Sequence, residues 1–265
     1  MYDFMMNSFS GGRNGRVLAI VNQKGGVGKS TTAVNLTAAL GLLGKKVLLI
    51  DLDPQGNATS GFALTKQRTR CVYNALTEEV PLRDLVEHVP ESRVDVVPAT
   101  IQLAGAEVEL VSALSRETRL KELIVPIKNS YDYILVDCAP SLGILTVNAL
   151  TAADGLIIPV QCEYYALEGL SKLLDSERLV KTHLNPDLEV FGVVMTMYST
   201  RTKLAQQVVD ETRKFFGDTV FDTVIPRTVR LSEAPGFGQT IFQYDPDGKG
   251  AQSYFALAKE VINRG

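Results

Sequence analysis

The sequence contains few of the residues that build cross-links and metal clusters. It has three cysteines, Cys71, Cys138 and Cys162, which are widely spaced and form no CxxC pair. Neither a disulfide framework nor a zinc site is therefore indicated. Its two histidines, His88 and His183, are isolated from other candidate ligands, and we expect them at the surface or at helix ends. A reducing, cytoplasmic setting fits this cysteine usage best.

Long hydrophobic runs and a strong charge of one sign are also missing. No apolar stretch approaches the ~18 residues that a membrane-spanning helix needs, and the N-terminus lacks the basic start and apolar middle of a signal peptide. The net charge is -3, so a protein that binds nucleic acid through bulk charge alone is excluded. Any contact with DNA would have to come from a local basic patch.

What the chain does have is an alternation of strand-like and helix-like segments, typical of a parallel sheet covered on both faces. The predicted strands are residues 17–22, 46–50, 94–97, 133–136, 156–160, 190–197 and 220–225. The predicted helices are residues 31–43, 142–153, 165–182, 203–216 and 251–262. Residues 103–127 are expected to be mostly helical, and residues 65–90 irregular with short helical pieces. We therefore predict an α/β fold with a single doubly wound, mostly parallel sheet.

No internal repeat and no linker rich in proline, glycine or serine interrupts this alternation. We expect one domain over residues 16–265, which is long enough to bury a sizeable core. Residues 1–15 are small and polar with glycines towards the end, and we expect them to form a flexible leader.

The segment QKGGVGKS at residues 23–30 follows the first predicted strand and precedes a predicted helix. A glycine turn in this position lets backbone N–H groups surround a phosphate, and the helix directs its positive dipole end at the same anion. Lys29 would reach the terminal phosphates, and the Ser30 hydroxyl would hold Mg²⁺. The alternative is a plain glycine turn with two solvated lysines. Because the residue types and their context agree, we predict the phosphate-binding loop of a P-loop NTPase.

This loop departs from the usual pattern in an informative way. A standard loop has glycine five residues before Gly28, where this chain has Gln23, and the next residue here is Lys24. A second lysine at the mouth of a phosphate site is charge that the loop cannot easily use internally. We infer that Lys24 acts elsewhere, for example on a second nucleotide.

Three acidic residues, Asp51, Asp53 and Asp137, fall where predicted strands end. In open parallel sheets, ligands bind beyond the carboxyl ends of the strands. Asp137 has the character of the acid that holds a Mg²⁺-bound water in phosphate-loop enzymes. Its alternative role is to cap the helix that follows Pro140.

Asp51 and Asp53 are two residues apart and would face the same side of a continuing strand. Asp51, nearer the strand, is predicted to join the Mg²⁺ shell. Asp53, further into the loop, is better placed to accept a hydrogen bond from the water that attacks the γ-phosphate. The alternative for this pair is a turn-capping role before Pro54.

Four segments carry a combined signature: KGGVGKST at 24–31, DLDPQGN at 51–57, VDCAPS at 136–141 and IPR at 225–227. Together they resemble the ParA/Soj family of chromosome and plasmid partitioning ATPases. The resemblance runs from about residue 16 onwards, and the motifs are specific in combination. The wider group has this deviant Walker A loop and includes the division-site protein MinD and the nitrogenase iron protein.

The resemblance implies a homodimer in which two subunits sandwich two ATP molecules with Mg²⁺. Lys24 would cross to the partner's phosphates and act like an arginine finger supplied in trans. Gly25 would lie where the subunits approach, so a bulky side chain there should block dimerisation. The implied nucleotide contacts are Lys24, Gly25, Gly26, Val27, Gly28, Lys29, Ser30 and Thr31, with Pro226 and Arg227 near the adenine ring. The implied catalytic residues are Lys24, Lys29 and Asp53, and the implied metal ligands are Ser30, Asp51 and Asp137.

The resemblance also implies that the ATP-bound dimer binds double-stranded DNA without sequence preference. The candidate surface lies in the C-terminal third and comprises Arg201, Lys203, Arg227, Arg230 and Lys249, of which Arg201 and Arg230 match the family best. Their alternative reading is a set of scattered, solvated basic residues. Glu163 matches the start of a family helix near the dimer interface, but an acid that complements the helix dipole explains it equally well.

The hypothesis is a cytoplasmic, nucleoid-associated ATPase with weak intrinsic activity, which converts ATP and water to ADP and phosphate. A centromere-binding partner of the ParB type would speed hydrolysis and release the dimer from DNA. The rival hypotheses are a MinD-like membrane-positioning ATPase and a biosynthetic enzyme that uses ATP on a small molecule. The mixed charge of residues 251–265 disfavours stable membrane association. An iron–sulfur reductase is also disfavoured, because no cysteine between Val72 and Asp137 could supply the second cluster ligand.

Overall fold

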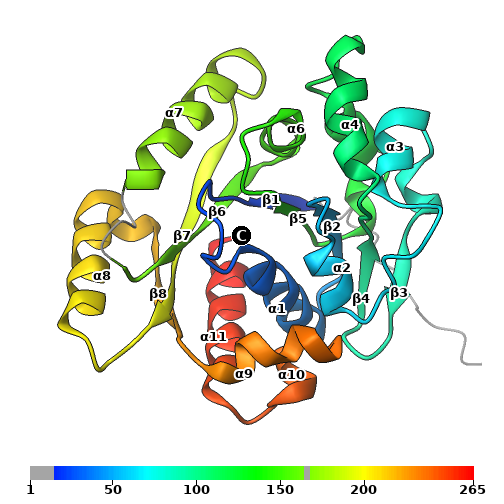
Figure 1. Ribbon diagram of the computed structural model, residues 1–265. Helices are drawn as coiled ribbons and strands as arrows, with labels where there is room; N and C mark the ends of the chain where they lie inside the picture. The colour runs from blue at the N-terminus through cyan, green and yellow to red at the C-terminus, as the bar shows by residue number, and fades with distance from the viewer. Residues whose placement is uncertain (1–14, 164–167) are drawn as a thin grey trace, which may run out of the picture.

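The computed structural model describes residues 15–163 and 168–265. Only Gly15 of the predicted leader is among them, and the predicted start of a helix near residue 165 also lies outside the described residues. The described chain forms an eight-stranded sheet in the order β3-β4-β2-β5-β1-β6-β7-β8 (Figure 1). Neighbouring strands are parallel, apart from the antiparallel pair β3 and β4. The predicted doubly wound, mostly parallel α/β fold is confirmed.

The strands alternate with helices along the chain (Figure 1). The strands are β1 (Arg16–Ile20), β2 (Val47–Leu52), β3 (Glu87–Val89), β4 (Val94–Val97), β5 (Tyr133–Cys138), β6 (Gly155–Gln161), β7 (Glu189–Tyr198) and β8 (Val220–Pro226). The longer helices are α1 (Lys29–Leu42), α6 (Ile144–Ala152), α7 (Glu168–His183), α8 (Lys203–Phe216) and α11 (Lys249–Arg264). The shorter ones are α2 (Asn57–Gly61), α3 (Val72–Glu78), α4 (Leu103–Glu109), α5 (Arg119–Ile124), α9 (Val229–Glu233) and α10 (Ile241–Tyr244).

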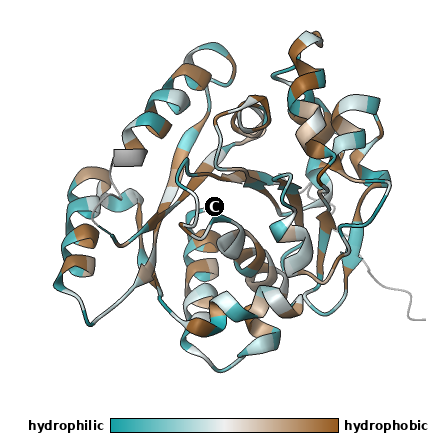
Figure 2. Cartoon of the chain, viewed as in Figure 1, coloured by the Kyte–Doolittle hydropathy of each residue, from teal (hydrophilic) through white to brown (hydrophobic). Residues whose placement is uncertain are grey.

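The central strand β1 shows why both faces of the sheet must be covered. Val17 and Ala19 pack into a core formed with helices α3 to α8, whereas Leu18 and Ile20 pack into a second core formed with α1 and α11. Successive side chains of a strand point to opposite faces, so a strand that is apolar throughout needs helices on both sides. Figure 1 shows α4, α6 and α7 on one side of the sheet and α1 and α11 on the other. Figure 2 shows the apolar strands between them.

Two strands extend further than predicted, and this moves two of the candidate acids. Asp51 lies within β2 and Asp137 lies within β5, because the parallel ladder pairs Asp51 with Asp137 and continues to the pair of Leu52 and Cys138. The prediction that both acids follow their strands was therefore wrong by one or two residues. The correction places the two carboxylates side by side on neighbouring strands.

Residues 103–127, predicted to be mostly helical, contain two separate helices, α4 and α5. The chain breaks between α4 and α5, where Ser115 has a left-handed φ of 52°. Asn148 of α6 stabilises the break, because its amide accepts a hydrogen bond from Leu120 N at 3.0 Å and donates to Arg116 O at 2.7 Å. The short elements β3, α2, α9 and α10 were not predicted as such, since three to five residues carry too little periodicity. No helix in the described part of the chain is long and apolar enough to cross a membrane.

Candidate nucleotide-binding site

The predicted phosphate-binding loop connects β1 to α1 and has the backbone of an anion site. Gly26 and Gly28 have φ values of 75° and 92°, in the left-handed region that favours glycine. Gly28 is the N-cap of α1, so the first N–H groups of a 14-residue helix open onto the loop. Lys29 is only 6% exposed, and its Nζ donates to the carbonyl of Lys24 at 3.0 Å. Burial lowers the pKa of Lys29, and the Asp137 carboxylate opposes this change.

Two buried side chains that the sequence analysis did not single out hold the loop in place. Thr196 of β7 donates its hydroxyl to the Val27 carbonyl at 2.8 Å. Asn22 donates its amide to the Pro159 carbonyl of β6 at 2.8 Å and accepts from Lys24 N at 3.0 Å. Both contacts join segments more than 100 residues apart along the chain, with separations of 169 and 137 residues. No local sequence signal could have revealed them.

The two lysines of the loop differ in their surroundings. The buried ammonium of Lys29 lies under the loop, whereas Lys24 is half-buried beside the exposed Gly25. An added Cβ at Gly25 would meet no atom within 4 Å. The edge of the loop beside Lys24 is therefore open on this subunit.

Asp51 is fully buried and has three hydrogen-bond donors. Its Oδ2 accepts from the backbone N and the hydroxyl of Thr59, at 2.7 and 2.6 Å, and its Oδ1 accepts from Asp53 N at 3.2 Å. Burial raises the pKa of Asp51 to about 6, although these hydrogen bonds oppose the rise. The predicted metal ligand thus also fixes α2 against the end of β2.

Asp137 is also fully buried, but neither of its carboxylate oxygens has a hydrogen-bond partner among the described residues. Burial raises its pKa well above the usual value, and the neighbouring Asp51 raises it further. The Ser30 hydroxyl is close enough to oppose this in part, yet it forms no well-directed hydrogen bond with either oxygen. The alternative role as a helix cap is excluded, because the N-cap of α6 is Gly143 and no N–H of the described backbone donates to Asp137.

An unpaired buried carboxylate is costly unless a cation or a hydrogen-bond donor compensates it. Asp137 lies near a second acid, a hydroxyl and the Lys29 ammonium. Oxygen donors of this kind are those that Mg²⁺ prefers. The residues present therefore fit a magnesium ion.

Asp53 follows β2 and is 7% exposed. Its Oδ1 accepts a hydrogen bond from Gln55 N at 2.9 Å, so the proposed turn-capping role is observed for this oxygen. The residue also lines the cavity over the loop. Capping one turn with one oxygen leaves the other for a ligand, and the two roles are compatible.

A cavity of about 420 Å³ brings most of the predicted nucleotide contacts together. Those that line it are Gly25, Gly26, Gly28, Lys29, Ser30, Thr31 and Asp53, joined by residues of α2 and by Pro140. Val27, Asp51 and Asp137 are buried and do not line it, and Lys24 lies outside its lining.

A smaller cavity of about 210 Å³ adjoins the first and contains Pro226 and Arg227, the predicted adenine neighbours. Both cavities are lined by Met197, whose φ of 52° is unusual for a residue other than glycine. Arg227 donates to Glu163 Oε1 at 2.8 Å. Glu163 is therefore held by an ion pair within its own subunit, beside the smaller cavity.

The predicted DNA contacts lie on three separate elements. Arg201 is in the turn after β7, Lys203 begins α8, and Arg230 is on α9; all three are exposed. Arg230 pairs with Glu233 at 3.1 Å, which offsets part of its charge. No ion pair within the described residues involves Arg201 or Lys203.

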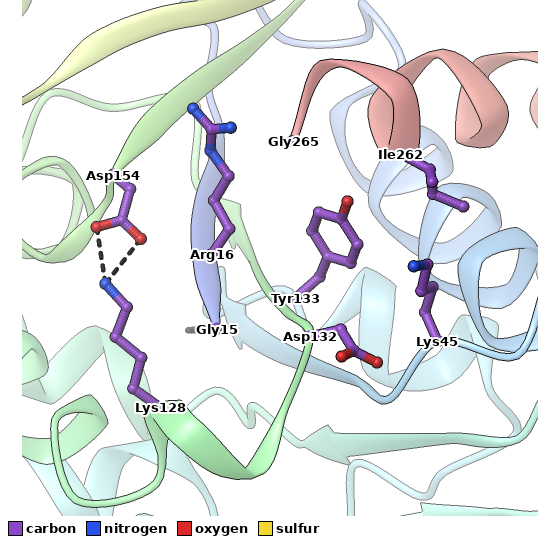
Figure 3. A pocket seen from close by; sticks show the side chains of 9 residues that line it. All are labelled: Gly15, Arg16, Lys45, Lys128, Asp132, Tyr133, Asp154, Ile262 and Gly265. Carbon is purple, nitrogen blue, oxygen red and sulfur yellow. Dashed lines mark hydrogen bonds and ion pairs between the residues drawn. The ribbon is translucent and has the colours of Figure 1, made fainter. Parts of the chain in front are cut away.

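A further cavity of about 490 Å³ lies at the opposite edge of the sheet, where β1 and β5 begin (Figure 3). It is lined by several charged residues, and those other than Lys45 are paired with one another or with nearby groups. Figure 3 shows Lys128 directed at both oxygens of Asp154, at 2.8 Å each. Arg16 donates to Glu189 at 2.7 Å. These ion pairs stabilise the amino-terminal edge of the sheet and indicate a structural role for this region.

The sequence matches a family model described as an AAA domain over residues 15–190. It is 57% identical over 252 residues to the sporulation initiation inhibitor protein Soj of Bacillus subtilis, covering 95% of this chain and all of that protein. It is 51% identical to the chromosome partitioning protein ParA of Myxococcus xanthus, covering 94% of this chain and 89% of that protein.

The chain belongs to the Soj/ParA family of chromosome-partitioning ATPases. The predicted family is thereby confirmed.

Solved structures add ligands to the comparison. Cobyrinic acid a,c-diamide synthase from Mycobacterium smegmatis, solved with ADP and magnesium, is 34% identical, with a TM-score of 0.83 over 94% of each chain. The septum site-determining protein MinD from Pyrococcus horikoshii, complexed with Mg-ADP, is 26% identical, with a TM-score of 0.75 over 93% of this chain and 95% of that one. The Soj/ParA fold of this chain is therefore shared with proteins that bind magnesium and adenine nucleotides.

Proposed function

We propose that the chain is an ATP-dependent switch for DNA partitioning. ATP binding drives formation of a sandwich dimer, the dimer binds DNA without sequence preference, and hydrolysis releases it. The observation that carries this proposal is the pair of lysines on one loop. Lys29 is buried beneath the nucleotide cavity, whereas Lys24 lies beside an open glycine edge that a second subunit can approach.

The nucleotide-binding step uses the loop and the two adjoining cavities. The N–H groups around Gly26 and Gly28 and the Lys29 ammonium bind the phosphates of ATP, and the smaller cavity at Pro226 takes the base. Ser30 and Asp137, with Asp51 beside them, hold Mg²⁺, which would offset the negative charge of the phosphates.

Hydrolysis in this proposal needs groups from both subunits. Asp53 positions the attacking water, and Lys24 of the second subunit stabilises the charge that develops on the phosphates. A single subunit lacks that second lysine at its own site. Its intrinsic ATPase activity is therefore weak, and a partner that brings the catalytic groups into position stimulates hydrolysis.

The DNA-binding step uses exposed cations on the β7–α8 turn and on α9. Arg201, Lys203 and Arg230 contact phosphates, so the interaction is independent of sequence and weakens with salt. Each subunit contributes one weak patch, and two patches on one duplex can raise the apparent affinity by ~10² or more. Dimerisation by ATP thus becomes a switch for DNA affinity, which suits a cytoplasmic, nucleoid-associated protein.

The central test is co-sedimentation with non-specific double-stranded DNA in ATP, in ADP, and for Lys24→Ala in ATP. We expect DNA binding only for the wild-type protein with ATP. Gly25→Val is the matched variant for the dimer, since an added Cβ at this position meets no atom of the same chain within 4 Å. It should still bind ATP but remain a monomer in analytical ultracentrifugation. Equal DNA binding in all arms would disprove the switch.

The role assigned to Asp53 is tested by the rate of ATP hydrolysis of the Asp53→Ala variant. Asp53→Ala should bind ATP, dimerise and bind DNA, yet hydrolyse ATP far more slowly than the wild type. Phosphate release at the wild-type rate would show that another group positions the water.

A biosynthetic role is the second candidate, favoured by the 34% identity to cobyrinic acid a,c-diamide synthase. An enzyme of that kind should hydrolyse or transfer phosphate in response to a small-molecule acid and not to DNA or a protein partner. The membrane-switch alternative is weaker. The apolar side chains Tyr254, Leu257, Ala258 and Val261 of α11 are buried in the core and are not available for a bilayer.

A further inference from the structure

An apolar groove lies on the face of the sheet opposite to α1. Its volume is about 800 Å³, and its walls come from the segment after α4, the start of α6 and the end of α7. Figure 1 shows α6 between α4 and α7 on this face. The apolar residues that matter most are Val111, Leu142, Ile144, Val147, Leu179 and Leu184.

Several of these side chains are unusually exposed. Val111 is 61% exposed, Leu179 is 62% exposed and Leu142 is 39% exposed, and each comes from a different wall of the groove. Figure 2 shows apolar segments on α4, α6 and α7 around this place. Scattered exposed apolar residues are normal, but a contiguous apolar depression marks an interaction surface. The groove therefore has the character of a docking site.

The charges in the groove indicate what kind of ligand it takes. Glu117 forms an ion pair with Arg116 at 2.8 Å, so their charges offset each other. Glu107 is different: its carboxylate lies against Gly143, where an added Cβ would be 2.4 Å from Oε1. No described residue donates a hydrogen bond to Glu107 or forms an ion pair with it. His183 also lines the groove. A ligand with a cationic group would supply the missing partner.

The groove is connected to the nucleotide site through one short segment. Pro140 lines the nucleotide cavity, and the next three residues, 141–143, line the groove. The segment follows directly on β5, which carries Asp137. Thr146 of α6 donates its hydroxyl to the Ser141 carbonyl at 2.6 Å and so ties the segment to the groove wall. A ligand in the groove would contact the same backbone that borders the nucleotide.

We propose that this groove docks the partner that stimulates hydrolysis, through an amphipathic segment with apolar side chains and a lysine or arginine for Glu107. Docking moves or stiffens residues 140–143 and thereby alters the position of groups at the nucleotide site. The proposal rests on the proposed function, since it assigns a surface to the partner invoked there. It gives the partner a helix-in-groove mode of binding, in which spaced apolar side chains anchor and one charge orients.

The test uses the full chain with ATP and a labelled 18-residue amphipathic peptide of leucine and lysine, together with its leucine and glutamate counterpart. The variants are Leu179→Gln, Glu107→Gln and Glu107→Lys. The control is Val125→Gln, because Val125 is equally exposed at 62% but lies outside the groove. Binding is followed by fluorescence anisotropy, and phosphate release is measured with and without each peptide.

We expect the basic peptide to bind the wild type and Val125→Gln and to raise phosphate release. Leu179→Gln and Glu107→Gln should weaken its binding by about tenfold each, the usual effect at an anchor residue. Glu107→Lys should reverse the preference in favour of the acidic peptide. Equal binding of the basic peptide to all variants, or no binding to the wild type, would overturn the proposal.

Co-sedimentation with DNA in ATP separates this inference from the proposed function. The groove variants should keep ATP-dependent DNA binding and dimerisation, because none of the changed residues lies at the nucleotide site. If Leu179→Gln and Glu107→Gln abolish dimerisation, the groove belongs to the contact between subunits and the docking proposal fails. If the wild type shows no ATP-dependent DNA binding, the proposed function itself fails.

Discussion

The two edges of the central sheet carry cavities of similar size and different character. The cavity at the carboxyl ends of the strands measures about 420 Å³, and the one at the amino ends measures about 490 Å³. Charged side chains lie at both edges, in or next to these cavities. At the amino edge, Lys128 pairs with Asp154, and Asp154 also accepts from Val17 N at 2.7 Å. At the carboxyl edge, Asp137 accepts no hydrogen bond from any residue that the structure describes.

This difference separates a binding site from a structural edge better than size does. Charged groups at the amino edge stabilise the fold by satisfying one another, so a ligand would have to compete with them. The buried Asp137 and the low-pKa Lys29 cost stability in the free protein, and a ligand with matching charge would recover that cost. Removing single charges at each edge should therefore have opposite consequences for stability and for nucleotide binding.

The largest effect is expected at the carboxyl edge for Lys29→Gln. Loss of the buried ammonium should lower the steady-state rate of phosphate release by about 10² to 10³, as for other preorganised groups that stabilise transition-state charge. Folding should be retained, because a buried cation is replaced by a neutral side chain. Phosphate release within threefold of the wild-type rate would contradict the assignment of Lys29.

The next largest effect is expected for Asp137→Asn, which should raise the free energy of unfolding of the free protein. In urea, without metal or nucleotide, the variant should be more stable than the wild type by about 1–3 kcal/mol, because it removes an unpaired buried charge. In the presence of Mg²⁺ and ATP the wild type should gain stability and the variant should gain much less. A variant that is less stable than the wild type in the metal-free buffer would show that the carboxylate is compensated.

The same variant carries a pH dependence. Burial raises the pKa of Asp137 in the folded state above its value in the unfolded chain. The folded protein therefore holds this proton more tightly, and the resulting stabilisation is fully present below about pH 4 and is lost as the pH rises. The advantage of Asp137→Asn over the wild type should therefore grow from pH 5 to pH 8. Urea midpoints at these two pH values, with EDTA present, provide the measurement. If the advantage of the variant shrinks as the pH rises, the expected pH dependence is wrong.

At the amino edge, Asp154→Ala should act on stability and spare the nucleotide. It leaves Val17 N and the Lys128 ammonium without their acceptor. The free energy of unfolding should fall by about 1–3 kcal/mol, the usual cost of an unsatisfied buried donor. The affinity for a fluorescent ATP analogue should stay within twofold of the wild type. A large loss of affinity would mean that the two edges are coupled.

The smallest effect is expected for Lys45→Gln, the matched control for Lys29→Gln. Lys45 lines the amino-edge cavity, and no ion pair in the described part of the chain involves it. Its removal should change the free energy of unfolding by less than about 0.5 kcal/mol and leave phosphate release unchanged. A loss of hydrolysis comparable to that of Lys29→Gln would remove the distinction between the edges.

The sequence by itself determined the phosphate-binding loop, the parallel sheet and the family. These features are local, since glycine positions, apolar runs and the lysine and serine spacing each act within a few residues. The helix over 203–216 was predicted with its observed limits for the same reason, because its apolar residues recur with helical spacing. The roles proposed for Lys24, Asp51 and Asp53 remain predictions.

Only the tertiary structure decided which polar groups are satisfied. The anchor from Thr196 to Val27 joins residues 169 positions apart, and the pair of Lys128 and Asp154 joins neighbours in space that no motif links. The strand order places Asp137 beside Asp51, and the donors nearby, Thr59 and Asp53 N, are directed at the Asp51 oxygens. The break before α5 and the groove beside Gly143 arise in the same way. Sequence periodicity specifies which side chains are buried, whereas the partners of a buried charge depend on which elements become neighbours.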